Sequence, residues 1–341
     1  MKIVSKVTLA VLLCVVVLTA AVGIGSVPIS PGDILQILGH KLFGLALPDG
    51  FDTISVSILW NIRLPRALLS FLVGAALAVS GTVMQSVLKN PLASSYTLGV
   101  SSGASLAAAV VMVTGATLPV LGRTFTLPIA GFAGGLLTVL LAIAFAAKLD
   151  RGMENQTIIL VGMVLSLFVN AVLTLITAFA REQLQRLVFW QMGSFASHEW
   201  SYLAILAALI LAGVLLLIGL AREMDIMTFG DEQALAVGVN LKTVKLTLLI
   251  LSALLTGASV AFVGVIGFVD LIAPHVVRKL FGSPHRLVVP MSALFGGAFM
   301  TLADLLSRTL VSPSEIPVGA VTALVGAPFF AFIYFKKRKK G

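Results

Sequence analysis

Long apolar runs recur along the whole 341-residue chain. The longest cover residues 7–25, 64–84, 96–113, 127–147, 158–180, 202–221, 244–266, 287–306 and 318–335, and each approaches the roughly 20 residues that a helix needs to cross a bilayer. Residues 268–277 form a shorter apolar run, which we expect to be a shallow or tilted span. Lipid offers no hydrogen bonds, so each span must satisfy its own backbone as a helix. The sequence therefore predicts an all-α membrane protein of about ten transmembrane helices, with residues 1–341 as a single transmembrane domain.

The composition and the charge distribution support this class. Hydrophobic residues make up 59% and charged residues 11% of the chain, against roughly 25% charged residues in soluble domains. With the N-terminus in the cytoplasm, only Lys41, Arg63, Arg66, Arg123, Arg181, Arg186 and Arg308 fall outside, and the other Lys and Arg residues, including the basic tail at 336–340, fall inside. The positive-inside rule thus predicts that both chain ends are cytoplasmic. A basic tail beside anionic lipid explains the net charge of +9 without a nucleic-acid partner.

Two local patterns indicate that the second predicted span belongs to a bundle. Gly74, Ala78 and Gly81 are spaced i, i+4, i+7, so they share one helix face and let a neighbouring backbone approach closely. The pair Asn90-Pro91 ends this span. We expect Asn90 to be the N-cap and Pro91 the first residue of the next helix.

Residues that carry catalysis or bind metals are scarce. Cys14 is the only cysteine, which excludes internal disulfides and Cys-ligated metal clusters. The sequence has no phosphate-binding loop of the G-x-x-x-x-G-K-S/T type. The histidines are scattered and form no metal-binding motif; they are His40, His198, His275 and His285. We therefore expect no enzyme activity, metal site or cofactor in this chain, and an ATP-driven pump would need a separate subunit that binds ATP and magnesium.

A secondary transporter driven by an ion gradient is the alternative that the residues leave open. Such proteins usually carry ionisable residues within their spans, and the intramembrane acids here are Asp270 and Asp304. Two carboxylates are few for a proton or sodium relay. Sodium sites built from carbonyls and hydroxyls would escape this test.

Ordered motifs run along the chain. Residues 63–66 read RLPR, residues 74–81 read GAALAVSG, residues 90–93 read NPLA and residues 98–104 read LGVSSGA. WQMGSF follows at 190–195, and the C-terminal third contains GVIGFVDLIAPHVVRKLFG, PHRLVVPMSALFGGAFMTLADLLSRTL and EIPVGAVTALVGAPFF. Together these strings resemble the FecCD/BtuC-type permease subunits of bacterial ABC importers for iron-siderophore complexes, haem and cobalamin. The resemblance covers nearly the whole chain and is specific for the family, but not for the substrate.

The resemblance implies a type II ABC importer permease in the cytoplasmic (inner) membrane. Its expected partners are a second permease subunit (another copy or a paralogue), two ATP-binding subunits, an extracytoplasmic substrate-binding protein and membrane lipid. The expected cargo is an iron chelate, with an iron-siderophore complex first and haem or cobalamin as the alternatives.

Site residues follow from the resemblance position by position. Arg63, Arg66 and Arg308 resemble outward-facing arginines that meet glutamates of the binding protein, and anchoring to lipid headgroups is the alternative. Asn90 and Leu92 lie where the family narrows the pathway on the cytoplasmic side.

Two residues within the spans have open roles. Asn170 is a candidate pathway-lining residue, although a helix–helix hydrogen bond explains an intramembrane Asn equally well. Asp270 stands where the family motif has Gly. We expect a local structural bond for Asp270 rather than a role in substrate or ion handling.

The cytoplasmic segment 222–245 is expected to couple the chain to its energy source. Gly230 and Gly238 bracket a helix-prone stretch with Asp231 and Glu232 in its first turn, where carboxylates complement the helix dipole. The residues alone fit a short helix or a plain surface loop equally well. The resemblance implies a coupling helix that sits in a cleft of the ATPase, with Gly230, Asp231, Glu232, Ala234, Leu235 and Gly238 as its residues.

Overall fold

The computed structural model describes residues 3–48, 51–119, 122–150, 152–180, 182–196 and 200–338, without the side chains of 123 and 333–338. Among the residues placed by sequence, Arg151, Arg181, His198 and the end of the basic tail lie outside the described residues. The described part forms helices and no β-strand, with an isolated bridge between Leu118 and Gly122. The predicted all-α class is confirmed.

Helices occupy every predicted span. Among the described residues, seven helical segments are long and apolar enough to cross a membrane: α1 (Ile3–Gly23), α4 (Leu64–Val87), α6 (Gly122–Leu149), α7 (Asn155–Phe179), α9 (Trp200–Gly219), α12 (Leu241–Val263) and α14 (His285–Thr309). Two of the other three predicted spans are the shorter helices α5 (Val100–Thr114) and α13 (Val269–Phe281). The third is α15 (Val318–Arg338), whose described apolar part covers Val318–Phe332. The 13 residues of α13 extend about 20 Å, less than the bilayer core, as expected for a shallow span.

Short helices connect the spans. α2 (Pro31–Phe43) begins at Ser30, whose hydroxyl accepts a hydrogen bond from the backbone N–H of Asp33, and ends at Gly44 in the left-handed conformation. α3 (Thr53–Ser57) and the π-helix η1 (Ile58–Arg63) lead directly into α4. The remaining short helices are η2 (Ser95–Leu98), α8 (Leu184–Gln191), α10 (Ala221–Met227) and α11 (Asp231–Ala236).

Helix α4 is the centre of the bundle and is buried along most of its length. Gly74 faces α14, where a Cβ atom would lie 2.9 Å from the carbonyl carbon of Gly296 and closer still to its oxygen. Gly81 faces α13, where a Cβ atom would lie 2.6 Å from the carbonyl carbon of Asp270. The predicted small-residue face is confirmed, because only glycine allows these two backbone contacts.

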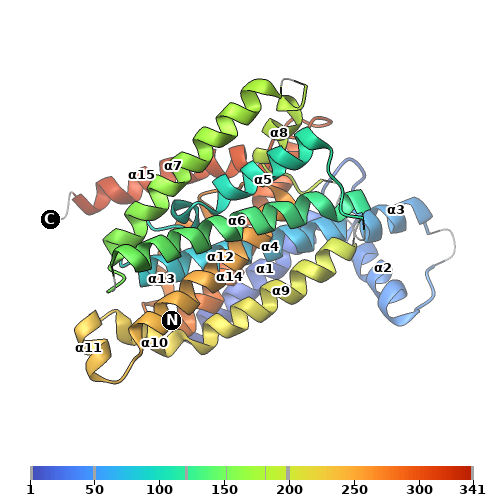
Figure 1. The fold of residues 1–341 in the computed structure, drawn as a ribbon. Helices are drawn as coiled ribbons and strands as arrows, with labels where there is room; N and C mark the ends of the chain where they lie inside the picture. Colours follow the sequence, from blue (N-terminus) through green and yellow to red (C-terminus); the bar gives the residue numbers. More distant parts are fainter. Residues whose placement is uncertain are drawn as a thin grey trace.

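Figure 1 shows two distinct ends of the bundle. The N-terminus, α10, α11 and the end of α15 lie toward the left of the view, whereas α2, α3 and α8 lie toward the right. We call these the α11 end and the α2 end. The start of α1 and the end of α15 therefore both lie at the α11 end.

The start of the span after α4 differs from the prediction. The side-chain oxygen of Asn90 accepts from the backbone N–H of Leu92 at 2.9 Å, which forms an Asx turn and not an N-cap. The 3-10 helix η2 follows, and Gly99 with φ 90° separates it from α5. The prediction that Pro91 opens the next span is wrong, because Asn90 bonds within its own turn and Gly99 interrupts the helix.

Candidate functional site

Arg63, at the end of η1, is buried against the connection between α1 and α2. Its guanidinium donates to the carbonyl oxygens of Val22 at 3.1 Å, Gly23 at 3.0 Å and Val27 at 2.6 Å. Carbonyls at the end of a helix have no intrahelical partner, and Arg63 supplies donors to them. The residue is 5% exposed, so it holds the α1–α2 connection and does not face outward.

Arg66, in the first turn of α4, forms two ion pairs. Its Nη2 lies 2.9 Å from Asp304 Oδ1, and its Nη1 lies 2.7 Å from Glu315 Oε1. The first pair compensates a carboxylate that is buried in α14. Glu315, in the connection from α14 to α15, is 40% exposed. The hydrogen bond from Arg66 is the main reason that the pKa of Glu315 lies below its ordinary value.

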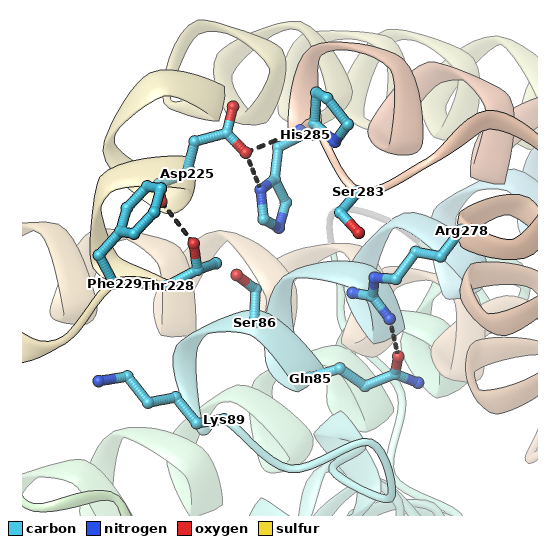
Figure 2. Close-up of a pocket in the computed structure, with 10 residues that line it drawn as sticks. Gln85, Ser86, Lys89, Asp225, Thr228, Phe229, Arg278, Ser283 and His285 are labelled. Atoms are coloured by element: carbon cyan, nitrogen blue, oxygen red, sulfur yellow. Dashed lines mark hydrogen bonds and ion pairs between the residues drawn. The ribbon is translucent and has the colours of Figure 1, made fainter. Parts of the chain in front are cut away.

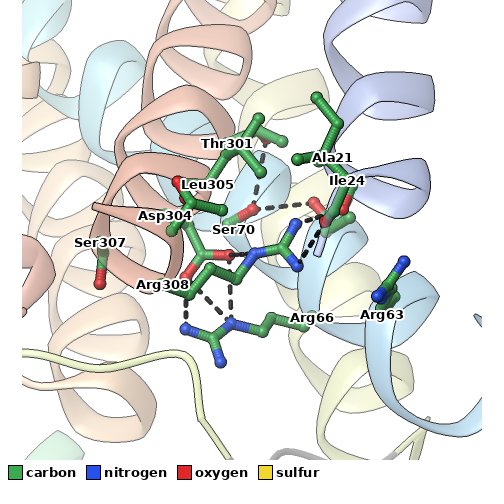
Figure 3. A network of polar contacts seen from close by, with 12 residues as sticks. Ala21, Ile24, Arg63, Arg66, Ser70, Thr301, Asp304, Leu305, Ser307 and Arg308 are labelled. Atoms are coloured by element: carbon green, nitrogen blue, oxygen red, sulfur yellow. Dashed lines mark hydrogen bonds and ion pairs between the residues drawn. The ribbon is translucent and has the colours of Figure 1, made fainter. Parts of the chain in front are cut away.

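Arg308 lies on the other side of Asp304, as Figure 3 shows. Its Nε is 3.7 Å from Asp304 Oδ2, and its guanidinium donates to the carbonyls of Ala21 and Ile24. The side chain of Arg308 is 11% exposed. The end of α1 is therefore held by two arginines, one from η1 and one from α14.

These contacts correct the expectation that the three arginines are exposed charges. Arg63 and Arg308 direct their donors to carbonyls of the α1–α2 connection, and Arg66 directs its donors to Asp304 and Glu315. The chain itself supplies the acceptors. Within this cluster, Arg66 beside the exposed Glu315 is the part within reach of a partner at the α2 end.

The segment 88–99, from the end of α4 to α5, contains the residues expected to narrow the pathway. Asn90 is half-buried in its Asx turn, and the side chain of Leu92 is 49% exposed. Leu92 thus extends from a loop fixed by the turn bond of Asn90.

Asp270 is buried at the start of α13 and bonds to two segments. Its carboxylate accepts from Ser94 Oγ, and its carbonyl accepts from Gln85 Nε2 at 3.2 Å. Toward the other end of α13, Arg278 donates to Gln85 Oε1 at 2.5 Å and to the carbonyl of Thr82 at 3.2 Å. The local structural bond expected of Asp270 is present, and it joins α13 to the segment 88–99.

A polar cavity of about 230 Å³ lies between α5, α7 and α8. Its polar lining consists of Ser101, Ser102 and Ser105 of α5, Asn170 of α7 and Gln191 of α8. The side-chain amide of Asn170 makes no hydrogen bond with the described residues. The helix–helix bond that the sequence allows for Asn170 is therefore not formed within the described part of this chain, and its amide is available at the cavity.

The predicted short helix in segment 222–245 is confirmed as α11, which projects from the bundle together with α10 (Figure 1). Gly230 with φ 129° and Gly238 with φ 85° flank it, and such angles favour glycine. Ala234 is buried against the bundle, whereas Glu232 and Leu235 are exposed. The helix thus presents one attached face and one free face.

Asp231, the first residue of α11, lies between two lysines. Its Oδ1 is 2.6 Å from Lys89 Nζ, and its Oδ2 is 2.7 Å from Lys245 Nζ. Burial raises the pKa of Asp231, but the hydrogen bonds from Lys245 and Lys89 outweigh burial and hold the pKa below the ordinary value of 3.8. Asp231 therefore does more than complement the helix dipole, because it ties α11 to the segment 88–99 and to α12.

A cavity of about 650 Å³ opens beside α10. Figure 2 shows Gln85, Ser86 and Lys89 on one wall, facing Asp225 and His285. His285 Nδ1 lies 2.6 Å from Asp225 Oδ1, and the same oxygen accepts from the backbone N–H of His285 at 2.9 Å. A carboxylate only accepts, so a neutral imidazole carries its proton on Nδ1. Within the described residues, no group of three or more His, Cys, Asp or Glu side chains is placed to hold a metal ion.

From the sequence, Asp304 is identified only as an intramembrane acid, and the pairing of Asp304 and Glu315 with the arginines is not predicted. Asp304 and Glu315 are the only acidic residues after Asp270, and they fall close to Arg308 in the sequence. The scarcity of acidic residues in this part of the sequence is the signal from which a pairing with Arg308 could be predicted. The pairing of Asp231 with Lys89 and Lys245 has no comparable signal in the sequence, because Lys89 follows α4, Asp231 begins α11 and Lys245 lies in α12.

Comparison with known proteins shows the family of this chain. The model of the FecCD transport family matches residues 12–336. The uncharacterized ABC transporter permease protein YvrB of Bacillus subtilis is 42% identical over 317 residues, which cover 93% of this chain and 89% of that protein. The hemin transport system permease protein HmuU of Yersinia pestis is 40% identical over 281 residues, which cover 82% of this chain and 84% of that protein.

A solved structure agrees with this relationship. An inward-facing conformation of an ABC transporter, described as a proposed metal-chelate type transporter, matches with a TM-score of 0.82 at 30% identity, covering 97% of this chain and 99% of that chain. The expected type II permease fold is confirmed by this match. With the family model matched over 12–336 and relatives aligned over most of both chains, this protein belongs to the FecCD transport family.

Proposed function

We propose that this chain is the translocation subunit of an ATP-driven importer for an iron chelate. An iron-siderophore complex is the first candidate, and haem and cobalamin are the alternatives. The observation that carries the proposal is the family match over residues 12–336. The hemin permease and the metal-chelate type transporter among its relatives support this class of cargo. The chain supplies a path, and ATP and magnesium bind to a partner subunit, since the sequence has no phosphate-binding loop.

A second permease subunit, either another copy or a paralogue, would complete the path. Helix α7 supports this arrangement, because its exposed apolar side chains include Leu160, Val164 and Leu167. An apolar face of a span suits lipid or another subunit, whereas hydroxyls and amides in the bilayer favour a protein or water-filled surrounding. We therefore place the polar cavity with Asn170 on the path, and Leu92 at its narrow cytoplasmic point.

Two ATP-binding subunits would dock at the α11 end, which places this end and both chain ends in the cytoplasm. Exposed apolar side chains gather around α11: Phe229 is 78% exposed, Leu235 58% and Val237 68%. Exposed apolar groups at the water-facing end of a membrane protein indicate a protein contact. Glycines at 230 and 238 give α11 the tight turns that it needs to enter a cleft.

The binding protein would dock at the α2 end through Arg66. In the isolated chain, Glu315 occupies the outer side of this guanidinium. A glutamate of the binding protein would replace Glu315, so that docking becomes an exchange of one carboxylate for another. Charge pairs at the rim of an interface mainly affect association rate and orientation.

Uptake by cells tests the proposal. The chain would be expressed with its ATPase and binding protein in a bacterium that lacks its own permeases of this family. We expect ligand-specific uptake of an iron-siderophore complex, haem or cobalamin, abolished when the ATPase carries a substitution in its phosphate-binding lysine. Uptake that persists with the inactive ATPase would contradict the proposed function.

A further inference from the structure

The ion pairs of Asp231 join segments that are far apart in the sequence. Its Oδ1 lies 2.6 Å from the Nζ of Lys89, which directly precedes Asn90. Its Oδ2 lies 2.7 Å from the Nζ of Lys245 in α12. The same Nζ lies 3.5 Å from the carbonyl oxygen of Met153, in the turn between α6 and α7. One carboxylate therefore connects α11 with the segment 88–99, with α12 and with the start of α7.

The two pairs differ in burial. The side chain of Lys245 is 2% exposed, whereas that of Lys89 is 36% exposed and that of Asp231 is 40% exposed. A buried ammonium that loses the carboxylate paired with it is strongly unfavourable, so the pair with Lys245 fixes the first turn of α11 to α12. The exposed pair with Lys89 is weaker and can break and form again.

Few other contacts hold α11 in place. Ala234 is its one buried residue, and Gly230 and Gly238 at its ends adopt positive φ angles. A short helix between two glycines can shift as a unit, and its side-chain bonds decide what shifts with it. Lys89 has φ 49°, which is uncommon for a residue other than glycine, and its backbone N–H bonds to the carbonyl of Ser86 at 3.3 Å. Lys89 thus lies directly after the end of α4, at the start of the segment 88–99 that contains Leu92.

We propose that Asp231 is a positioning residue that transmits displacement of α11 to the segment 88–99 through Lys89, and to α12 and the start of α7 through Lys245. This inference rests on the proposed function, because it requires an ATPase that moves α11. The buried pair carries α12 and the α6–α7 turn along with α11. The exposed pair pulls or releases the loop that holds Leu92. Ion pairs with a merely structural role would stabilise α11 without changing the amount of ligand transported per ATP.

The test uses the complete complex of permease, ATPase and binding protein in proteoliposomes. ATP hydrolysis and ligand uptake are measured in the same sample, and bound ATPase is quantified by subunit stoichiometry. The variants are Asp231→Asn, Lys89→Gln and the two combined, with Asp231→Glu as the conservative variant. Lys148→Gln is the matched control, because Lys148 is exposed at the end of α6 and makes no ion pair with any described residue.

We expect Lys89→Gln to retain bound ATPase and hydrolysis, while ligand transported per ATP falls roughly fivefold or more. Asp231→Asn also breaks the buried pair with Lys245, so it should lower this ratio at least as far. The combined variant should be no worse than Asp231→Asn alone, because both changes break the same connection. Asp231→Glu should recover most of the ratio, and Lys148→Gln should leave it unchanged. An unchanged ratio in Asp231→Asn, or losses that add in the combined variant, would overturn the inference. A parent complex without ATP-driven uptake would instead contradict the proposed function.

Discussion

The contact of α4 with α13 makes Gly81→Ala a sensitive test of the bundle. The added Cβ would lie 2.6 Å from the carbonyl carbon and 2.7 Å from the Cα of Asp270. Both are backbone atoms, so no side-chain rotation relieves the contact and α13 must move away. The movement would also weaken the bond from Gln85 Nε2 to the Asp270 carbonyl, which measures 3.2 Å.

The expected destabilisation follows from three contributions. Forcing an extra methyl group into a well-packed contact costs about 1–3 kcal/mol, and the upper part of this range applies to a backbone neighbour. The weakened hydrogen bond adds about 1 kcal/mol. The better helix propensity of Ala returns about 1 kcal/mol. We therefore expect Gly81→Ala to lower the free energy of unfolding by about 2–3 kcal/mol.

Unfolding of the purified chain in mixed micelles with rising SDS content measures this change. Gly219→Ala is the matched control, because Gly219 ends the apolar helix α9 and its Cβ would meet nothing within 4 Å. We expect the control to match the parent or exceed its stability slightly. Equal stability of Gly81→Ala and Gly219→Ala would refute the close approach of α4 and α13.

Three further changes test individual contacts. Arg63→Lys keeps the charge but loses the planar guanidinium that donates to three carbonyls. Thermal unfolding of the purified chain should therefore show a free energy of unfolding lower by about 1–3 kcal/mol. Stability equal to that of the parent would contradict the capping role. Glu315→Gln removes the carboxylate that pairs with Arg66 and should tighten binding of the substrate-binding protein about two- to fivefold at low salt. Titration of the reconstituted complex measures this affinity, and weaker binding would contradict the proposal that a glutamate of the binding protein replaces Glu315. The pKa of Glu315 is lowered from 4.5, so its pair with Arg66 persists above pH 4.5 and is lost as the pH falls through the lowered value; the difference between parent and variant should disappear there. Asp270→Asn keeps an acceptor for Ser94, so uptake should remain close to that of the parent from acid to neutral pH, and loss of uptake at normal membrane levels would indicate a charged role.

The spans and their central packing could be predicted because their signals are local. Hydropathy over about 20 residues locates a membrane helix without any tertiary information, and the short α13 was recognised by its length. The spacing of Gly74 and Gly81 predicts a close helix contact, and both glycines meet backbone atoms of neighbouring helices. Gly230 and Gly238 likewise marked the ends of α11.

The remaining features depend on contacts that the sequence does not encode locally. Arg63 bonds to backbone carbonyls, which every residue possesses, so no residue type marks its partners. The pair Asn90-Pro91 predicts an N-cap, because Asn-Pro fits that role. An Asx turn uses the same side-chain oxygen, however, and this loop forms the Asx turn. Lys245 lies among the apolar residues at the start of α12, and its pairing depends on the position of Asp231 in the folded chain.

The driving force of transport is the most direct test of the account. The purified complex would be reconstituted into proteoliposomes, and uptake of the labelled chelate would be compared with ATP on the ATPase side, with a sodium gradient and with a proton gradient. Our account requires uptake that depends on ATP, on the ATPase subunit and on the binding protein, and that is unaffected by either gradient alone. Uptake by the permease without its ATPase, driven by an ion gradient, would contradict it and identify the chain as a secondary transporter.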